Sequence, residues 1–247
     1  MSGIDRVIWL DSAASTNSEL AARCGTLPHG AVIACRCQTA GRGQRGNSWE
    51  AEPGRNLTFS LLLRPSVIGP AGSFRMSMLV AIAVAESLEQ AMPGQHVSVK
   101  WPNDIYVGDM KICGILIENS FSANRIDRAI VGIGINVNQT EFRSDAPNPV
   151  SMAMLTGRTY DLGNLLGAVT RHIIETFDSY ETAPDDDDLS RRYPARLWRR
   201  HGLHRWHDAL TGEDITAAIR DVALTGHLTL DTDPPRTYAF KEISAIL

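Results

Sequence analysis

The sequence has few cysteines, and their spacing argues against both a disulfide framework and a zinc site. The 247-residue chain contains four, Cys24, Cys35, Cys37 and Cys113, and none of them forms a C-x-x-C pair. Cys35 and Cys37 would share one face of a strand, without the histidine or second cysteine pair that a zinc site requires. The cysteines are therefore expected to be reduced and packed, as in a cytoplasmic protein.

The sequence also lacks a long apolar run and an excess of positive charge. Its longest apolar stretch, residues 76–88, is too short and too interrupted for a membrane span, so a core helix is predicted there. Asp5 and Arg6 precede any apolar run, which argues against a signal peptide. A net charge of −4 provides no basic field for nucleic acid or anionic lipid. Neither DNA nor a membrane is expected as a partner.

A length of 247 residues fits one large domain, or a large domain with a small appendix, and the 43% of hydrophobic residues is enough to bury a core. Residues 73–92 carry apolar residues at helical spacing and predict the most regular helix. The acidic run that follows Pro184 is predicted to start a helix, although an acidic binding tail is an alternative. Only short strands are predicted after residue 202, at residues 214–224, 226–233 and 236–247, which gives an α+β main domain and a barrel-like C-terminal appendix. Strands are predicted at residues 7–10, 31–38, 56–65, 97–101, 104–107, 111–119 and 128–138, and further helices at 15–25, 150–156 and 161–180.

A glycine-rich loop, TAGRGQRGNSWE at residues 39–50, has the G-x-G-x-x-G spacing of a dinucleotide-binding loop. That fingerprint requires a helix after the loop and an acidic residue about 20 positions later. Pro53, Gly54 and a strand follow instead, and residues 61–70 contain no acid, so the spacing does not indicate a Rossmann fold. The glycines and two arginines, Arg42 and Arg45, are suited to an anion, but a flexible surface hairpin is equally consistent with them.

Two further segments concentrate polar residues and glycines. Lys100, Asn103, Asp104 and Lys111 place two cations, an amide and an acid on a strand, a turn and a hairpin, and Gly114 allows a ligand to approach closely. Each lysine taken alone is more typical of a solvent-exposed surface. In VGIGINVN, residues 131–138, Gly132 and Gly134 alternate on one strand face with Asn136, whose amide can read a flat heterocycle. Sheet packing beneath a helix is the alternative for these glycines.

Five segments together are more specific than any one of them: STN (15–17), QTAGRGQRGNSW (38–49), KWPND (100–104), KICGIL (111–116) and GIGINVN (132–138). In order and spacing they resemble the biotin–protein ligase family from Asp11 to Asn138. The resemblance implies a mixed, largely antiparallel sheet flanked by helices in residues 1–200, and a small SH3-like β-barrel in residues 201–247. Because 14 residues precede STN, the chain resembles the short class of the family, from which no repressor activity is expected.

The resemblance implies a ligase that joins biotin to ATP with Mg²⁺, forms biotinyl-5′-AMP, and transfers biotin to a lysine of a biotin carboxyl carrier protein. Such a reaction needs no enzyme nucleophile, and neither a G-x-S-x-G elbow nor a Cys–His pair stands out. It needs positive charge where a carboxylate attacks a phosphate, and a loop that excludes water. A homodimer that pairs through a sheet edge is left open.

The resemblance also implies residue roles. Lys111, Arg42 and Asp104 would be catalytic, and Asp104 would also contact magnesium. Biotin would be bound by Ser15, Thr16, Asn17, Gln38, Gly41, Arg42, Gly43, Lys111, Gly114, Ile115 and Leu116. ATP would be bound by Arg42, Gln44, Arg45, Trp49, Lys100, Asn103, Lys111 and Asn136. The sequence does not separate roles in triphosphate, magnesium or acceptor binding for Lys100, Asn103 and Asp104.

Two residues of the loop depart from the pattern of the family. Gln44 and Asn47 stand where many members have arginine, which puts in doubt how tightly the loop retains the adenylate. A lipoate or octanoate ligase is an alternative, but those relatives lack KWPND and use a different glycine-rich motif. A non-catalytic biotin- or nucleotide-binding module is a second alternative, against which Lys111 and Arg42 argue.

Overall fold

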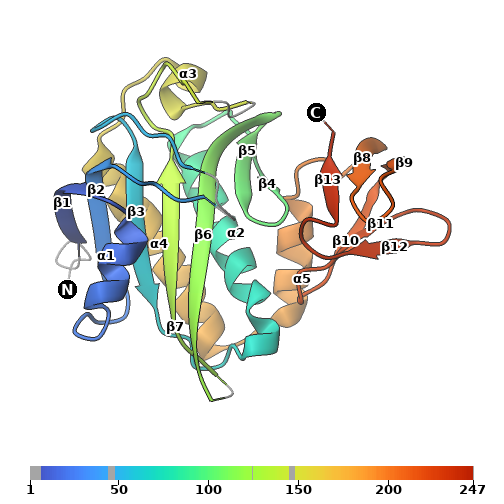
Figure 1. The fold of residues 1–247 in the computed structure, drawn as a ribbon, viewed down its shortest axis with the longest axis horizontal. Coiled ribbons are helices and arrows are strands. Elements are labelled where there is room, and N and C mark those ends of the chain that lie inside the picture. Colours follow the sequence, from blue (N-terminus) through green and yellow to red (C-terminus); the bar gives the residue numbers. More distant parts are fainter. Residues whose placement is uncertain (1–6, 44–47, 124, 145–147, 247) are drawn as a thin grey trace.

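A seven-stranded sheet forms the centre of the computed structural model, which describes residues 7–43, 48–123, 125–144 and 148–246 (Figure 1). Its strand order is β1-β2-β3-β7-β6-β5-β4. Only the β1–β2 pair is parallel, which confirms the expected mixed, largely antiparallel sheet. The strands are β1 (Val7–Ala13), β2 (Val32–Gln38), β3 (Leu57–Leu63), β4 (Val97–Lys100), β5 (Asp104–Val107), β6 (Met110–Ser122) and β7 (Arg125–Ile135).

Helices cover both faces of this sheet (Figure 1). α1 (Thr16–Arg23) packs on β2, β3 and β7, whereas α2 (Phe74–Ala91) lies on the opposite face with α4 (Leu162–Thr182) and α5 (Asp186–Ala195). A short 3-10 turn, η3 (Pro70–Gly72), leads into α2, and α3 (Met152–Thr156) precedes α4. Asp185 caps α5 through the backbone N–H of Asp188, so the acidic run starts a helix as predicted.

The α2 helix is the apolar centre of the helical layer. By length and composition alone, the helical segment Pro70–Ala91 is long and apolar enough to cross a membrane. The sequence predicted a core helix for the shorter apolar stretch at residues 76–88. Eleven residues of α2 are buried in this fold, between the sheet and the neighbouring helices. Its apolar character is therefore accounted for by the protein core.

The β5, β6 and β7 strands bring the glycine-containing segments together. Gly108, at φ 57°, makes the predicted turn between β5 and β6. In the β6–β7 ladder, Gly114 lies opposite Gly134 and Leu116 lies opposite Gly132. Because side chains alternate across a strand, these four positions share one face of the sheet. The missing side chains leave room above the ladder.

The last part of the chain forms two small antiparallel sheets, which we call the C-terminal β-module. One sheet contains β10 (Ile219–Val222), β11 (Leu228–Leu230) and β12 (Arg236–Tyr238), and the other contains β13 (Ile243–Ala245), β8 (His204–Asp208) and β9 (Asp214–Ala217). These sheets agree with the expected SH3-like appendix. The sequence predicted β9 and β10 as a single strand and β12 and β13 as another, and it gave no prediction for β8. The division between residues 200 and 201 stays a prediction.

Candidate functional site

A single cavity of about 330 Å³ collects most of the residues that the sequence singled out. The residues that line it belong to the glycine face of β6 and β7, the start of α1 and the C-terminal β-module. Figure 1 shows how these elements are arranged. The size of the cavity is suited to a small molecule. The predicted residues that line it are Ser15, Thr16, Asn17, Gln38, Arg42, Gly43, Trp49, Lys100, Asn103, Asp104, Lys111, Gly114, Ile115 and Leu116.

A buried polar cluster forms one end of the cavity, where α1 begins. Ser15 occupies the N-cap position of α1 but makes no side-chain capping bond, and its side chain lines the cavity instead. The backbone N–H of Thr16 donates to Gln38 Oε1 at 2.9 Å. Asn17 is 4% exposed, accepts from the Ser60 hydroxyl at 2.6 Å, and donates from Nδ2 to a carboxylate oxygen of Glu118 at 2.7 Å. This end therefore holds fixed amide and hydroxyl groups.

The glycines around the cavity are required by close packing. A Cβ on Gly132 would overlap the Asn17 amide, and one on Gly134 would overlap the Trp49 indole. A Cβ on Gly114 would lie 3.0 Å from Trp49 Cζ3. The Trp49 indole thus occupies the groove above the Gly114–Gly134 pair. Its buried Nε1 has no hydrogen-bond partner within the described part of the chain.

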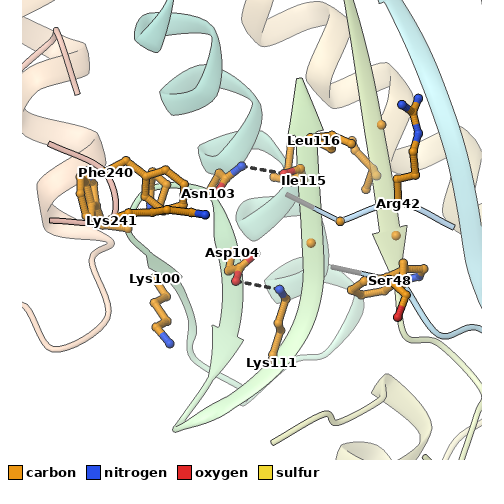
Figure 2. Close-up of a pocket in the computed structure, with 18 of the residues that line it drawn as sticks. Arg42, Ser48, Lys100, Asn103, Asp104, Lys111, Ile115, Leu116, Phe240 and Lys241 are labelled. Carbon is orange, nitrogen blue, oxygen red and sulfur yellow. Dashed lines mark hydrogen bonds and ion pairs between the residues drawn. The ribbon is translucent and has the colours of Figure 1, made fainter. Parts of the chain in front are cut away.

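The middle of the cavity carries an ion pair. Lys111 Nζ lies 2.7 Å from Asp104 Oδ2, with each side chain about one-third exposed (Figure 2). The Lys111 ammonium also lies 5.9 Å from the centre of the Trp49 ring. Asn103 is buried and donates to the Ile115 carbonyl at 2.6 Å, which fixes the turn that presents Asp104. Asp104 is the single carboxylate among the described residues of the lining.

The other two predicted cations have different partners. Lys100 Nζ lies 3.0 Å from the Tyr106 hydroxyl, above the rings of Tyr106 and Trp198. Arg42 lies 3.4 Å from a Glu118 carboxylate oxygen, and in Figure 2 its guanidinium points away from Lys111. Arg42 and Lys111 therefore share one cavity without converging on one point in this structure.

The remaining predicted residues lie elsewhere. Gly41 does not line the cavity, but a Cβ there would lie 2.7 Å from the Trp49 carbonyl oxygen, so glycine allows this close approach, and the Gly41 carbonyl accepts from the Trp49 N–H at 3.0 Å. Asn136 is buried outside the lining and donates to the Val150 carbonyl at 3.1 Å. Its Oδ1 has no partner within the described ranges. Gln44, Arg45 and Asn47 lie outside the described residues.

The sequence analysis missed two groups of residues near the cavity. Ser60 and Glu118 orient Asn17 from the middle of β3 and β6, where no motif marked them. The C-terminal β-module, whose role the sequence left open, closes one wall. Its lining residues are Trp206, Ile219, Phe240, Lys241, Ile243, Ser244 and Ala245. Because these residues are far from the motifs in sequence, only the fold reveals their contribution.

The cavity has features of electrostatic catalysis but no activated thiol. Complete burial raises the pKa of the nearby Cys113 thiol far above its ordinary value, so this group stays protonated. No group of three or more histidine, cysteine, aspartate or glutamate residues that could hold a metal occurs in the described part of the chain. The arrangement instead offers ammonium groups, a carboxylate and fixed amides around a small-molecule space.

Comparisons with known proteins agree with this geometry. Residues 9–136 match the biotin/lipoate A/B protein ligase family. The chain is 34% identical over 217 residues to the biotin–[acetyl-CoA-carboxylase] ligase of Paracoccus denitrificans, covering 83% of this chain and 89% of that one. It is 33% identical over 174 residues to the bifunctional ligase/repressor BirA of Bacillus subtilis, covering 68% of this chain and 50% of that protein. The chain thus spans about half the length of the BirA proteins that it matches.

Solved structures give the same result for the fold. The biotin protein ligase of Aquifex aeolicus in complex with biotin and ATP has a TM-score of 0.78 and 25% sequence identity, with 97% of each chain covered. A point mutant of that ligase in complex with biotin has a TM-score of 0.79 and covers 98% of this chain. The likeness extends over both the central sheet and the C-terminal β-module.

Proposed function

Because this chain belongs to the biotin/lipoate A/B protein ligase family, we propose that it activates biotin as biotinyl-5′-AMP and transfers it to a lysine of a biotin carboxyl carrier protein. One observation carries the proposal: a single cavity joins the buried amide and hydroxyl cluster at α1 to the Lys111–Asp104 pair. The names of the relatives support biotin and ATP as substrates.

The two ends of the cavity suit the two substrates. Ser15, Thr16 and Gln38 would hydrogen-bond the ureido ring of biotin, and the β6 segment from Gly114 to Leu116 would form the floor of its pocket. Fixed buried amides suit such a ligand because they lose little entropy on binding. Trp49 would line the nucleotide side, and Lys100 and Asn103 would lie near the phosphates.

In the proposed first step, a carboxylate oxygen of biotin attacks the α-phosphorus of ATP and pyrophosphate leaves. Both reactants are negatively charged, so the site must supply positive charge at the point where they meet. Lys111 would bridge the carboxylate and the phosphate, and Asp104 would orient its ammonium group. Arg42 would leave Glu118 and turn toward the phosphate, a movement that belongs to a closing loop.

Magnesium would enter with the triphosphate. Mg²⁺ is usually held by one or two carboxylates together with substrate phosphates, not by a protein cage. Asp104, the one carboxylate of the described lining, fits that requirement and would contact the ion, which would neutralise phosphate charge.

In the proposed second step, a lysine amine of the carrier attacks the mixed anhydride and AMP leaves. The anhydride is already activated, so the enzyme has only to position it and exclude water. The carrier partner, a cytoplasmic location and the absence of a repressor role belong to the proposal. The four cysteines, all free in this structure, support a reducing compartment.

The test is to incubate the protein with biotin, Mg-ATP and an apo carrier domain, and to follow transfer with an avidin blot. Labelling of the carrier that requires ATP and the acceptor lysine is the expected result. Replacing biotin with lipoate tests the alternative ligase, and preferential transfer of lipoate would favour it. Biotin binding in calorimetry without pyrophosphate release would favour a non-catalytic binding module and contradict the proposal.

A further inference from the structure

Lysine is rare in this chain, and its placement is selective. Of the 24 lysine and arginine residues, only Lys100, Lys111 and Lys241 are lysines, and all three line the same cavity. Elsewhere the chain uses arginine, which supplies the cation in most of its ion pairs. A lysine ammonium is a compact point charge, whereas a guanidinium is a broad planar fork. The placement of all three lysines on one cavity points to a ligand that binds compact positive charges.

Lys241 has no role in either of the two proposed reaction steps. It follows Phe240 at the start of the turn into β13, and in Figure 2 its side chain extends from the C-terminal β-module toward Asn103 and Asp104. Lys111 is paired with Asp104, and Lys100 rests on aromatic rings. Lys241 makes no hydrogen bond or ion pair with the residues that the structure describes. Its charge is therefore available to a ligand.

The backbone conformation at Lys241 favours glycine over a residue with a side chain. Its φ of 79° lies in the left-handed region, which glycine adopts easily and a side-chain-bearing residue adopts at a cost in free energy. Among the described residues, the ammonium makes no hydrogen bond or ion pair that would offset this cost. A strained residue on a cavity wall points to a role toward the ligand.

The order of charges along the cavity indicates which part of ATP would lie near Lys241. In Figure 2, Arg42 lies on one side, Lys111 and Asp104 lie in the middle, and Lys241 lies on the far side. If the biotin carboxylate meets the α-phosphate at Lys111, the β- and γ-phosphates extend away from the biotin end, toward Lys241. A lysine is well suited to bind phosphate as a point charge.

We propose that Lys241 binds the β- and γ-phosphates of ATP and stabilises pyrophosphate as it leaves, so that the C-terminal β-module completes the nucleotide site. This inference rests on the proposed function. In the step concerned, the bond from the α-phosphorus to the biotin carboxylate forms and the bond to the β-phosphate oxygen breaks. The electron pair and the added negative charge pass to pyrophosphate, where the Lys241 ammonium balances part of it. Transfer from biotinyl-5′-AMP does not involve these phosphates.

The test compares Lys241→Gly, Lys241→Arg and Ala123→Gly with the unsubstituted enzyme. Glycine removes the charge and relieves the backbone, so Lys241→Gly should fold at least as well as the parent. Ala123, at φ 52° in the β6–β7 turn and outside the cavity lining, controls for the gain of glycine at a left-handed position. Two reactions are measured for each protein: biotin-dependent pyrophosphate release over a range of ATP concentrations, and single-turnover transfer from preformed biotinyl-5′-AMP.

Lys241→Gly should raise the KM for ATP by about tenfold or more, corresponding to the loss of one charge-assisted contact. Transfer from the preformed adenylate should keep the parental rate, and Lys241→Arg should restore part of the ATP affinity. An unchanged KM for ATP, or an equal loss of rate in both reactions, would overturn the proposed role of Lys241 without contradicting the proposed function. A parent enzyme that releases no pyrophosphate would overturn the proposed function and this inference with it.

Discussion

At the residue scale, the Lys111–Asp104 pair is the most direct link between geometry and chemistry. Lys111→Ala should lower biotin-dependent pyrophosphate release by a factor of about 100 to 1,000, because charge developing in the transition state loses its partner. The control is Arg220→Ala, which removes a cation from an exposed ion pair outside the cavity lining. Near-normal release by Lys111→Ala would remove Lys111 from its proposed role.

A second residue-scale prediction concerns Gly132. Its substitution by alanine places a Cβ where the Asn17 amide lies, and Asn17 cannot yield easily because Ser60 and Glu118 both hold it. Gly132→Ala should therefore weaken biotin binding by about tenfold or more, the equivalent of one buried hydrogen bond. Calorimetric titration with biotin measures the effect. Gly167→Ala in α4, where a Cβ meets open space, should bind biotin as the parent does.

The sequence predicted the residues of the site that stand out by type and spacing. Glycines within strands are uncommon, and here they occur in short motifs beside the KWPND segment and Lys111; the cavity collects most of these residues. Ser60 and Glu118 could not be predicted, because single polar residues within strands carry no signal of their partners. Trp49 was expected to line the site, but only the structure shows its indole in the groove between Gly114 and Gly134.

At the element scale, periodicity predicted most of the main sheet and its helices. The helix expected at residues 73–92 is α2, Phe74–Ala91, because its apolar residues repeat at the helical spacing. The strand β8, His204–Asp208, was missed because two histidines and a buried aspartate interrupt its apolar pattern. Asp208 is buried only because tertiary contacts satisfy it, including the Tyr238 hydroxyl at 2.8 Å. Such contacts are invisible in a local sequence window.

The start of α5 supports a prediction on pH. Hydrogen bonds from Arg75 and Tyr180 lower the pKa of Asp186 to about 2, below its ordinary value of 3.8. A lowered carboxyl pKa contributes stability above the unfolded value, and that contribution is lost as pH falls from about 4 toward 2. Urea unfolding at pH 5 and pH 3 should show a smaller fall in the free energy of unfolding for Asp186→Asn than for the parent.

The neighbouring position supplies the control for that experiment. Asp187→Asn changes an exposed carboxylate in the same helical turn, so its pH dependence should match that of the parent. If Asp186→Asn loses as much stability between pH 5 and pH 3 as the parent does, the Arg75–Asp186 pair does not contribute to the pH dependence of the free energy of unfolding.

At the scale of the whole molecule, the C-terminal β-module is joined to the main sheet beside the cavity. Where the chain leaves α5 for this module, the Val99 N–H donates to the Arg196 carbonyl at 2.8 Å, and the Trp198 N–H donates to the Val99 carbonyl at 2.9 Å. Trp101 Nε1 donates to the Gly226 carbonyl at 3.0 Å, and its ring packs edge-on against Phe240. These contacts hold one wall of the cavity against the other.

Trp101→Phe removes the indole hydrogen bond and keeps much of the aromatic packing. It should lower the free energy of unfolding by about 1 kcal/mol, measured by urea denaturation. Trp9→Phe, at a side chain that is 37% exposed, should change it by less than about 0.5 kcal/mol. Equal effects of the two substitutions would show that the Trp101 contact does not stabilise the joined parts.

This cavity is proposed to condense biotin with ATP to form biotinyl-5′-AMP. The most direct measurement is to incubate the unsubstituted protein with Mg-ATP, with and without biotin, and to quantify pyrophosphate and biotinyl-5′-AMP by mass spectrometry. We expect pyrophosphate release that depends on biotin, with one biotinyl-5′-AMP formed for each pyrophosphate. Release that is independent of biotin, or biotin binding with no adenylate formed, would contradict it.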